Sequence, residues 1–100
     1  MAWRIVWSRL ALSDLRDLVR YIAKDDRDVA KRFGDLIVTK VESLQSFPRI
    51  GRMVPEYRED RLREIIIAPY RVVYEIDDEA VTLSILRIWR GARGDLELTR

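Results

Sequence analysis

"PYRVVYEIDDEAVTLSILRIWRGAR", residues 69–93, contains two runs of β-branched and aromatic residues joined by an acidic turn. Alternating apolar and polar residues in such runs are typical of half-buried strands, so the segment predicts an antiparallel hairpin. Pairing Ile76 with Val81 across the turn sets the register. Even-numbered positions from 70 to 76 then share a face with odd-numbered positions from 81 to 85, and we expect this face to meet helices.

The opposite face of the predicted sheet carries charged side chains mixed with a few apolar ones. Its members are Glu64, Arg71, Val73, Glu75, Thr82, Ser84, Leu86, Ile88 and Arg90. We expect this face to lie outside the core and to be the surface where a partner or substrate binds. The simpler alternative is that Glu64, Arg71 and Glu75 form solvated cross-strand ion pairs, which contribute only about 0 to 1 kcal/mol. On the same alternation Trp89 falls on the helix-facing side and is expected to be a packing residue.

A short strand and a first helix are predicted at the start of the chain. Residues 3–7, "WRIVW", alternate and are rich in strand-forming residues. Ser8 is a suitable N-cap for a helix that runs to about Ala23. The apolar stripe of this helix consists of Ala11, Leu15, Leu18, Val19 and Ile22. The opposite side, which includes Asp14, is expected to be solvated.

A second helix follows the polar run "KDDRD" and completes a helical hairpin. Asp26 or Asp28 can cap it, and Pro48 stops it near Ser46. After a loop with prolines and glycine, residues 61–67, "RLREIII", predict a further strand. The fold class is therefore α+β, with an N-terminal strand and an antiparallel helical hairpin packed on a C-terminal antiparallel β-sheet. We expect residues 1–100 to form a single domain, since this length leaves no room for a second one.

Composition excludes several kinds of chemistry. The chain has neither cysteine nor histidine, which removes the thiol nucleophile and the commonest metal ligand. We expect no cofactor and no metal site. Of the 19 basic residues three are lysines, so 16 are arginines, which suit bidentate contacts with carboxylate or phosphate. Charges interrupt the apolar N-terminal run, so neither a signal peptide nor a membrane contact is predicted, and a cytoplasmic location is expected.

Four segments in this order carry a family resemblance that covers nearly the whole chain. They are "SRLALSDLRDLVRYIA", "FPRIGRMVPE", "LREIIIAPYRVVYEI" and "LRIWRGAR". The chain resembles the RelE/ParE superfamily of type II toxin–antitoxin toxins. This resemblance implies the α+β fold described above, an ability to inhibit growth, and a cognate antitoxin as partner.

The superfamily contains two kinds of toxin. The ParE-like kind inhibits DNA gyrase, is neutralised by a ParD-like antitoxin and is linked to plasmid stabilisation. The RelE-like kind enters the ribosome and cuts mRNA as an endonuclease, which requires a base, an acid and cations around the phosphate. A toxin relic that retains only antitoxin binding is a third alternative.

The ParE-like interpretation is favoured because Arg90 occupies a position where many of the nucleases have histidine, and arginine is a poor general acid. An enzymatic activity is therefore not the leading expectation. We predict that Arg71, Arg90 and Arg93 bind the target. If the chain were an endoribonuclease, the candidate catalytic residues would be Glu64, Arg71 and Arg90.

Overall fold

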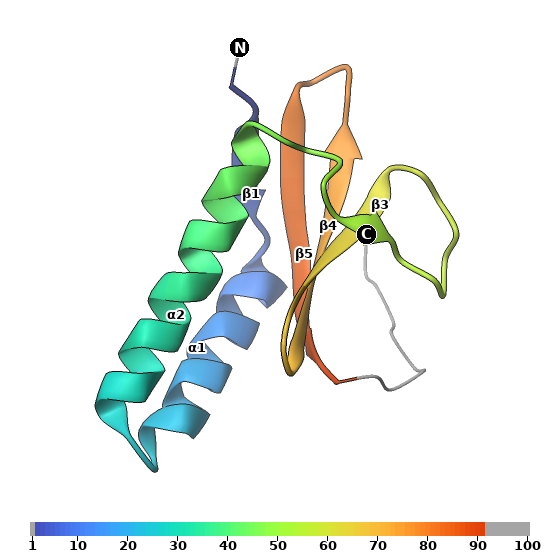
Figure 1. The fold of residues 1–100 in the computed structure, drawn as a ribbon. Coiled ribbons are helices and arrows are strands. Elements are labelled where there is room, and N and C mark those ends of the chain that lie inside the picture. The colour runs from blue at the N-terminus through green and yellow to red at the C-terminus, as the bar shows by residue number, and fades with distance from the viewer. Residues whose placement is uncertain (1, 92–100) are drawn as a thin grey trace.

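The protein is a two-layer α+β domain, with a helical hairpin on one face of a twisted five-stranded sheet (Figure 1). The structure, a computed structural model, describes residues 2–91. Its elements are β1 (Arg4–Trp7), α1 (Arg9–Ala23), α2 (Arg27–Glu42), a 3-10 turn (Ser43–Gln45), β2 (Arg52–Met53), β3 (Leu62–Ile67), β4 (Tyr70–Asp77) and β5 (Thr82–Arg90). The predicted fold class is confirmed.

Both helices begin at the caps that the sequence indicates. Ser8 Oγ accepts a hydrogen bond from the Ala11 amide at 3.0 Å. Asp26, and not Asp28, caps α2, because its carboxylate accepts hydrogen bonds from the first amides of that helix. α2 ends at Glu42, and a 3-10 turn completes the segment that the apolar pattern had extended to Ser46.

The sheet is mixed, in the order β1-β5-β4-β3-β2. Strands β2 to β5 pair antiparallel, whereas β1 pairs in parallel with β5. A parallel pair needs a long crossover, which here includes the helical hairpin. The sequence analysis predicted β1 but not its position in the sheet. It did not predict β2, which has two residues.

The predicted register of the last hairpin is wrong by two residues. Ile76 lies opposite Leu83, and Asp77 lies opposite Thr82. Val81 belongs to the turn, where its φ of 50° is left-handed. The Asp77 carboxylate accepts from the Ala80 amide at 3.0 Å and closes the wider turn. Because a shift of two residues preserves alternation, Leu83 and Ile85 still face the helices as predicted.

A β-bulge at Leu86 reverses the alternation in the second half of β5. Tyr74 pairs with Ile85, but Val73 pairs with Arg87, so Leu86 has no partner on β4. An extra residue in one strand exchanges the faces of all later residues. The predicted orientations beyond the bulge are therefore wrong.

Three residues change face as a result. Ile88 was predicted on the open face, but it is 5% exposed and belongs to the core beneath the helices. Trp89 packs on the opposite face and not on the helix side. Arg90 lies on the helix side, with its guanidinium carbon 5.8 Å from the centre of the Tyr21 ring of α1.

The N-cap of α1 and one side chain within α1 bind the backbone of β5 at this bulge and just beyond it. Ser8 Oγ donates to the Leu86 carbonyl at 2.9 Å, and Asp14 accepts a hydrogen bond from the Ile88 amide at 2.9 Å. Asp14 also accepts two hydrogen bonds from Arg87, at 2.8 and 3.1 Å. Asp14, which was expected to be solvated, is thus a structural residue that satisfies a backbone amide of β5 beyond the end of its pairing with β1.

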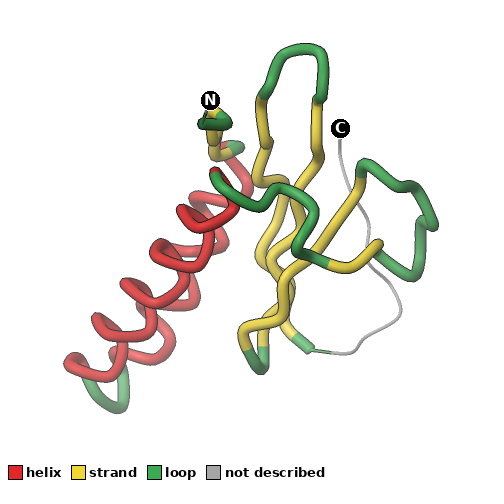
Figure 2. The backbone as a smooth tube through the Cα atoms, turned by 45° about the horizontal axis from the view of Figure 1, so that its top comes forward, coloured by secondary structure: helices red, strands yellow, loops and turns green. Residues whose placement is uncertain are grey.

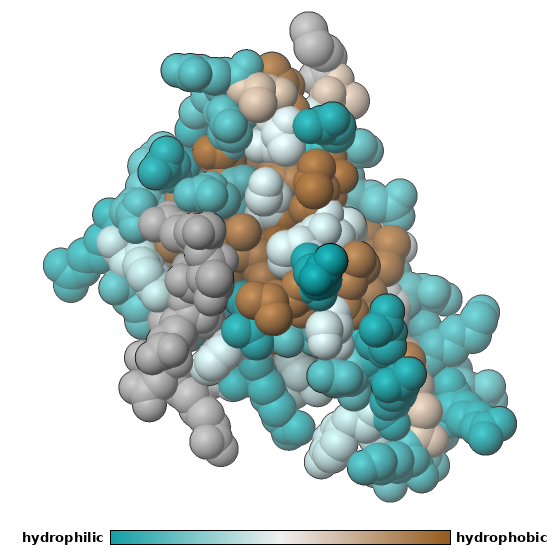
Figure 3. All heavy atoms as spheres, turned by 180° about the vertical axis from the view of Figure 1, so that it is seen from behind, coloured by the Kyte–Doolittle hydropathy of each residue, from teal (hydrophilic) through white to brown (hydrophobic). Residues whose placement is uncertain are grey.

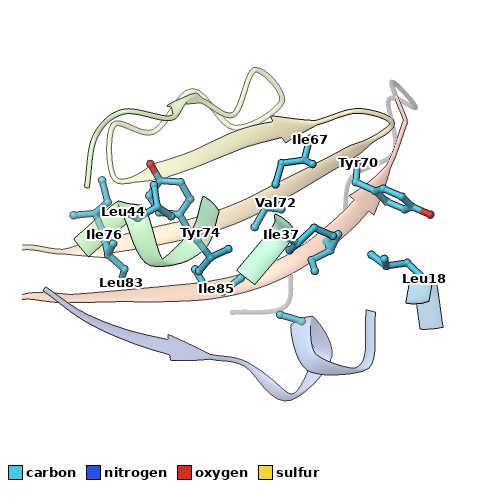
Figure 4. Close-up of a cluster of buried hydrophobic side chains, with 13 residues drawn as sticks. Leu18, Ile37, Leu44, Ile67, Tyr70, Val72, Tyr74, Ile76, Leu83 and Ile85 are labelled. Carbon is cyan, nitrogen blue, oxygen red and sulfur yellow. The ribbon is translucent and has the colours of Figure 1, made fainter. Parts of the chain in front are cut away.

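The main hydrophobic core lies between the sheet and the helical hairpin (Figure 4). Its fully buried residues include Ala11, Ile37, Val41, Leu44, Val72, Tyr74, Leu83 and Ile85. A second, smaller core of Val54, Leu62, Val73 and Leu86 lies on the opposite face of the sheet. That face was predicted to lie outside the core, which is wrong because the connection between β2 and β3 supplies Val54 and Tyr57 to cover it.

We expect Asp14→Ala to destabilise the fold by about 1–3 kcal/mol, because it leaves the Ile88 amide and the Arg87 guanidinium without their carboxylate partner. Asp17→Ala, which removes an exposed acid from the same helix, should change stability by less than about 0.5 kcal/mol. Urea unfolding followed by circular dichroism measures both. Equal losses in the two variants would contradict a role for Asp14 at the bulge.

Candidate functional site

The candidate site consists of Arg52, Glu56, Glu64 and Arg71. Arg52 and Glu56 belong to the connection between α2 and β3, which crosses the edge of the sheet (Figure 2). The fully buried Tyr74 of β4 anchors it. Its hydroxyl donates to the Pro48 carbonyl at 2.7 Å and accepts from the Gly51 amide at 3.1 Å. Arg63 adds a hydrogen bond to the Gly51 carbonyl at 3.0 Å. This anchoring fixes where the connection enters β2.

Four charged side chains form a continuous network on the outer face of the sheet, away from the helices. Arg71 Nε donates to Glu64 Oε1 at 2.7 Å, and Arg52 Nε donates to Glu64 Oε2 at 2.6 Å. The two terminal nitrogens of Arg71 donate to both carboxylate oxygens of Glu56, at 2.8 and 2.7 Å. Two arginines and two glutamates give the network a net charge of zero.

The middle of this network is buried. The Glu64 side chain is 0% exposed and that of Arg71 is 7% exposed, whereas Arg52 is 59% exposed. The sequence analysis offered solvated cross-strand ion pairs as the simpler alternative. The pairing of Arg71 with Glu64 is correct, but the pair is buried and not solvated. Desolvating a charge is costly unless it is paired and hydrogen-bonded, which explains why both oxygens of Glu64 bind an arginine.

The titration behaviour of the site follows from these pairs. Hydrogen bonds from Arg71 lower the pKa of the Glu56 carboxyl. Hydrogen bonds to Glu56 and then Glu64 raise the pKa of Arg71, against the opposing effect of burial. Burial raises the pKa of Tyr74. Each of these shifts moves the pKa further from neutral pH.

A pocket of about 440 Å³ lies beside the network. Its lining residues are Arg52, Pro55, Glu56, Ile66, Ala68, Pro69, Tyr70, Arg71 and Gly91. The arginines and Glu56 form its charged side, and the prolines, Ile66 and Tyr70 form an apolar wall. Within residues 2–91, no group of histidine, cysteine, aspartate or glutamate side chains is arranged to hold a metal ion.

The structure separates the residues that the sequence analysis grouped together. Glu64 and Arg71 are in contact. Arg90 instead lies on the helix side of the sheet beside Tyr21, and the Lys24 Nζ lies 6.0 Å from the centre of the same ring. Arg93 lies outside the described residues. Arg90 and Arg71 thus lie on opposite faces of the sheet. The roles of Arg71, Arg90 and Arg93 in target binding remain predictions.

Glu56 and Arg52 were not predicted as site residues. Arg52 is opposite Glu64 across the β2–β3 pair. Because β2 has only two residues, no alternation in the sequence indicates this strand or its pairing. Glu56 lies in an irregular stretch between β2 and β3, so neither alternation nor helical periodicity indicates its orientation.

A second surface feature is the groove between α1 and α2 on the outside of the hairpin. Its volume is about 390 Å³, and its lining residues are Leu15, Val19, Ala23, Arg27, Ala30, Lys31, Gly34, Asp35 and Val38. Gly34 allows the helices to lie close together, since a Cβ there would be 3.2 Å from Val19 Cγ2. The floor is apolar, and charged residues of α2 form one rim. Such a groove fits an amphipathic helix.

The chain belongs to a family of toxins. The family model described as "ParE toxin of type II toxin-antitoxin system, parDE" matches residues 5–94. The Sinorhizobium fredii protein named "Putative toxin Y4kP" is 35% identical over 85 residues, which are 83% of this chain and 85% of that protein. "Toxin RelE2" of Caulobacter vibrioides is 32% identical over 91 residues, which are 90% and 97% of the two chains. The protein is thus a type II toxin of the ParE/RelE superfamily.

Solved structures show the same fold. A toxin–antitoxin structure of the chromosomal ParDE system of P. aeruginosa matches with a TM-score of 0.73 at 22% identity, over 91% of this chain and 98% of that one. The RelBE2 toxin–antitoxin complex of Mycobacterium tuberculosis matches with a TM-score of 0.67 at 26% identity, over 95% of each chain. Relatives of both branches therefore share the architecture.

We expect Gly51→Ala to cost about 1–3 kcal/mol of stability by overpacking. A Cβ at this position would lie 2.6 Å from both the Glu64 carbonyl oxygen and the Tyr74 hydroxyl. Gly34→Ala is the matched control. Its Cβ would lie 3.2 Å from a side-chain methyl of Val19, which has to shift slightly, and the gain in helix propensity of about 1 kcal/mol offsets this contact. Thermal and urea unfolding should rank Gly51→Ala far below Gly34→Ala, and the reverse order would contradict the anchoring of this connection.

The stability that Glu56 provides should depend on pH. Because the folded pKa of Glu56 is lowered from its ordinary value of 4.5, its contribution is complete above that value and is lost as pH falls through the folded pKa. We expect Glu56→Gln to cost about 1–2 kcal/mol near neutral pH and progressively less in acid. Unfolding free energies of both proteins between about pH 3 and pH 7 measure this, and a difference that stays constant over the range would contradict it.

Proposed function

We propose that the protein is a ParE-like toxin that inhibits DNA gyrase and that a cognate, ParD-like antitoxin neutralises it. The activity consists of binding and not of catalysis. Such a toxin acts in the cytoplasm, stops growth when released from its antitoxin, and can stabilise a plasmid that encodes both. The observation that carries the proposal is the state of the candidate catalytic residues, Glu64 and Arg71.

Glu64 and Arg71 are engaged with each other and with two further charged residues. A general base must reach its proton, but Glu64 is fully buried and both its oxygens accept hydrogen bonds from arginine. The third candidate, Arg90, lies on the other side of the sheet beside Tyr21. Six side chains within residues 2–91 have a shifted pKa, and none of these pKa values moves toward neutral pH, where a group transfers protons efficiently.

The antitoxin contact that we propose uses the outside of the helical hairpin. Its apolar groove fits an amphipathic helix, and large apolar residues are exposed on both helices. These are Leu10, Leu12, Tyr21, Val29, Leu36 and Val38. Figure 3 shows, on the side opposite the view of Figure 1, hydrophobic residues gathered in the middle with hydrophilic residues around them. An extended segment of the same antitoxin would follow the sheet.

An mRNA endonuclease of the RelE-like kind is the alternative function. The match to "Toxin RelE2" at 32% identity and the RelBE2 structure at 26% identity favour it. In that case Arg71 would have to exchange Glu56 for a phosphate of the RNA. A relic that only binds an antitoxin would show neither activity.

Two assays with the purified toxin distinguish these functions. We expect the protein to inhibit supercoiling by gyrase and to leave mRNA on programmed ribosomes intact. Site-specific cleavage in the ribosomal A site that is lost in Arg71→Ala or Glu64→Gln would contradict the proposal and establish the alternative. Co-expression with the product of the neighbouring gene, followed by size-exclusion chromatography, tests for the antitoxin.

Arg90→Ala combined with Arg93→Ala should fold normally and lose gyrase inhibition. Arg90 is exposed at the end of β5, so the substitutions should change stability by about 0.5 kcal/mol or less. An interface arginine can contribute about 2 kcal/mol, or roughly a thirtyfold change in affinity. Arg16→Ala with Arg32→Ala removes the same charge from exposed helical positions and is the control. Supercoiling inhibition at the parental potency in the first double variant would show that these arginines do not contact the target.

A further inference from the structure

We propose that Arg71 is the centre of a carboxylate-binding site that the chain fills with its own Glu56, and that an acidic side chain of a protein partner replaces Glu56 there. The inference deepens the antitoxin contact and rests on the proposed function for the identity of that partner. The site itself is defined by contacts within this chain.

The first support is the geometry around Arg71. Its two terminal nitrogens each donate to a different oxygen of Glu56, at 2.8 and 2.7 Å. This bidentate arrangement is the strongest way for a guanidinium to recognise a carboxylate. Glu64 binds Nε at 2.7 Å and so fixes the plane of the guanidinium. Arg71 therefore keeps one hydrogen-bond partner in the sheet when Glu56 is displaced.

The two glutamates differ in how firmly they are held. Glu64 is a strand residue with a fully buried side chain, and Arg52 holds its second oxygen. The Glu56 side chain is 24% exposed and belongs to the irregular stretch between β2 and β3. Two residues later, Arg58 has a φ of 51°. This left-handed conformation is unfavourable for any residue other than glycine. Glu56 is thus the partner that can leave.

The adjoining pocket indicates what could take its place. Glu56 and Arg71 line a volume of about 440 Å³ together with the apolar residues Pro55, Ile66 and Pro69. Ile66 is 53% exposed. A nucleic acid would require a run of cations, but the two arginines of this lining already share Glu64. A peptide carboxylate next to an apolar side chain matches both parts of the pocket.

The self-contact has a predictable effect on affinity. A partner carboxylate binds only when Glu56 is displaced, so the apparent affinity is reduced by the fraction of molecules in which the site is open. Weakening the contact between Glu56 and Arg71 should therefore tighten binding of an acidic partner. A purely structural ion network predicts the opposite, because loosening it would disorder the site.

The test uses the purified toxin and synthetic peptides at constant ionic strength. One peptide alternates leucine with glutamate, a second alternates leucine with glutamine, and a single-stranded oligonucleotide of equal charge is the third probe. Glu56→Gln keeps the size of the side chain but removes its charge. Glu79→Gln makes the same change in the turn between β4 and β5 and is the matched control.

We expect Glu56→Gln to bind the glutamate peptide about tenfold more tightly than the parent or Glu79→Gln, with no gain for the glutamine peptide. Arg71→Gln should abolish the binding. Fluorescence anisotropy measures the affinities. The NMR signal of Arg71 Nε–H in the unsubstituted protein provides a second measurement that does not depend on a variant, and it should shift as the peptide saturates the site.

Four results would overturn the inference. They are binding that is unchanged or weaker in Glu56→Gln, binding that persists in Arg71→Gln, an unshifted Arg71 signal at saturation, and a gain for the oligonucleotide in place of the peptide. The last result would assign the site to phosphate. None of these measurements involves gyrase, ribosomes or growth, so they can fail while the proposed function holds, and the reverse is equally possible.

Discussion

Two hydrogen bonds, one that Ser8 donates to the Leu86 carbonyl and one that Asp14 accepts from the Ile88 amide, are the contacts on which the arrangement of this toxin depends. They join the first helix to the edge of the sheet where β1 ends, since β1 pairs with β5 only as far as Ile85. Beyond that point α1 supplies the partners that a neighbouring strand would otherwise provide. The bulge then decides which side chains face the helices, and it places Trp89 beside the outer network and Arg90 beside Tyr21.

A domain of this size has little apolar volume for both faces of its sheet. The helices cover one face, and the connection between α2 and β3 covers part of the other with a small apolar core. Paired arginines and glutamates occupy the remainder. Buried ion pairs contribute little net stability because desolvation offsets their attraction, but they penalise every arrangement in which one partner is missing. Such a network specifies one conformation of the connection more than it strengthens the fold.

This distinction between specificity and stability bears on function. For the binding function proposed above, an arginine held in a fixed orientation is more useful than a side chain that titrates near neutral pH. The proposal of gyrase inhibition and the proposal of a carboxylate site at Arg71 both describe recognition by preorganised cations. Similar proteins with ParE-type and RelE-type names show that one architecture occurs in more than one toxin.

The sequence by itself determined the helices and the longer strands, because caps, periodicity and turn residues act over a few neighbouring positions. The family followed from the resemblance of four segments in their order along the chain. Ser8 and Asp26 begin their helices as their side chains predict, and alternation located the helix-facing half of β4. Only the tertiary structure decided the bulge, the burial of Glu64 and the contact between Arg71 and Glu56. Each of these depends on groups far apart in the chain, such as Asp14 and Ile88, and a local pattern carries no information about a backbone group that a distant side chain satisfies.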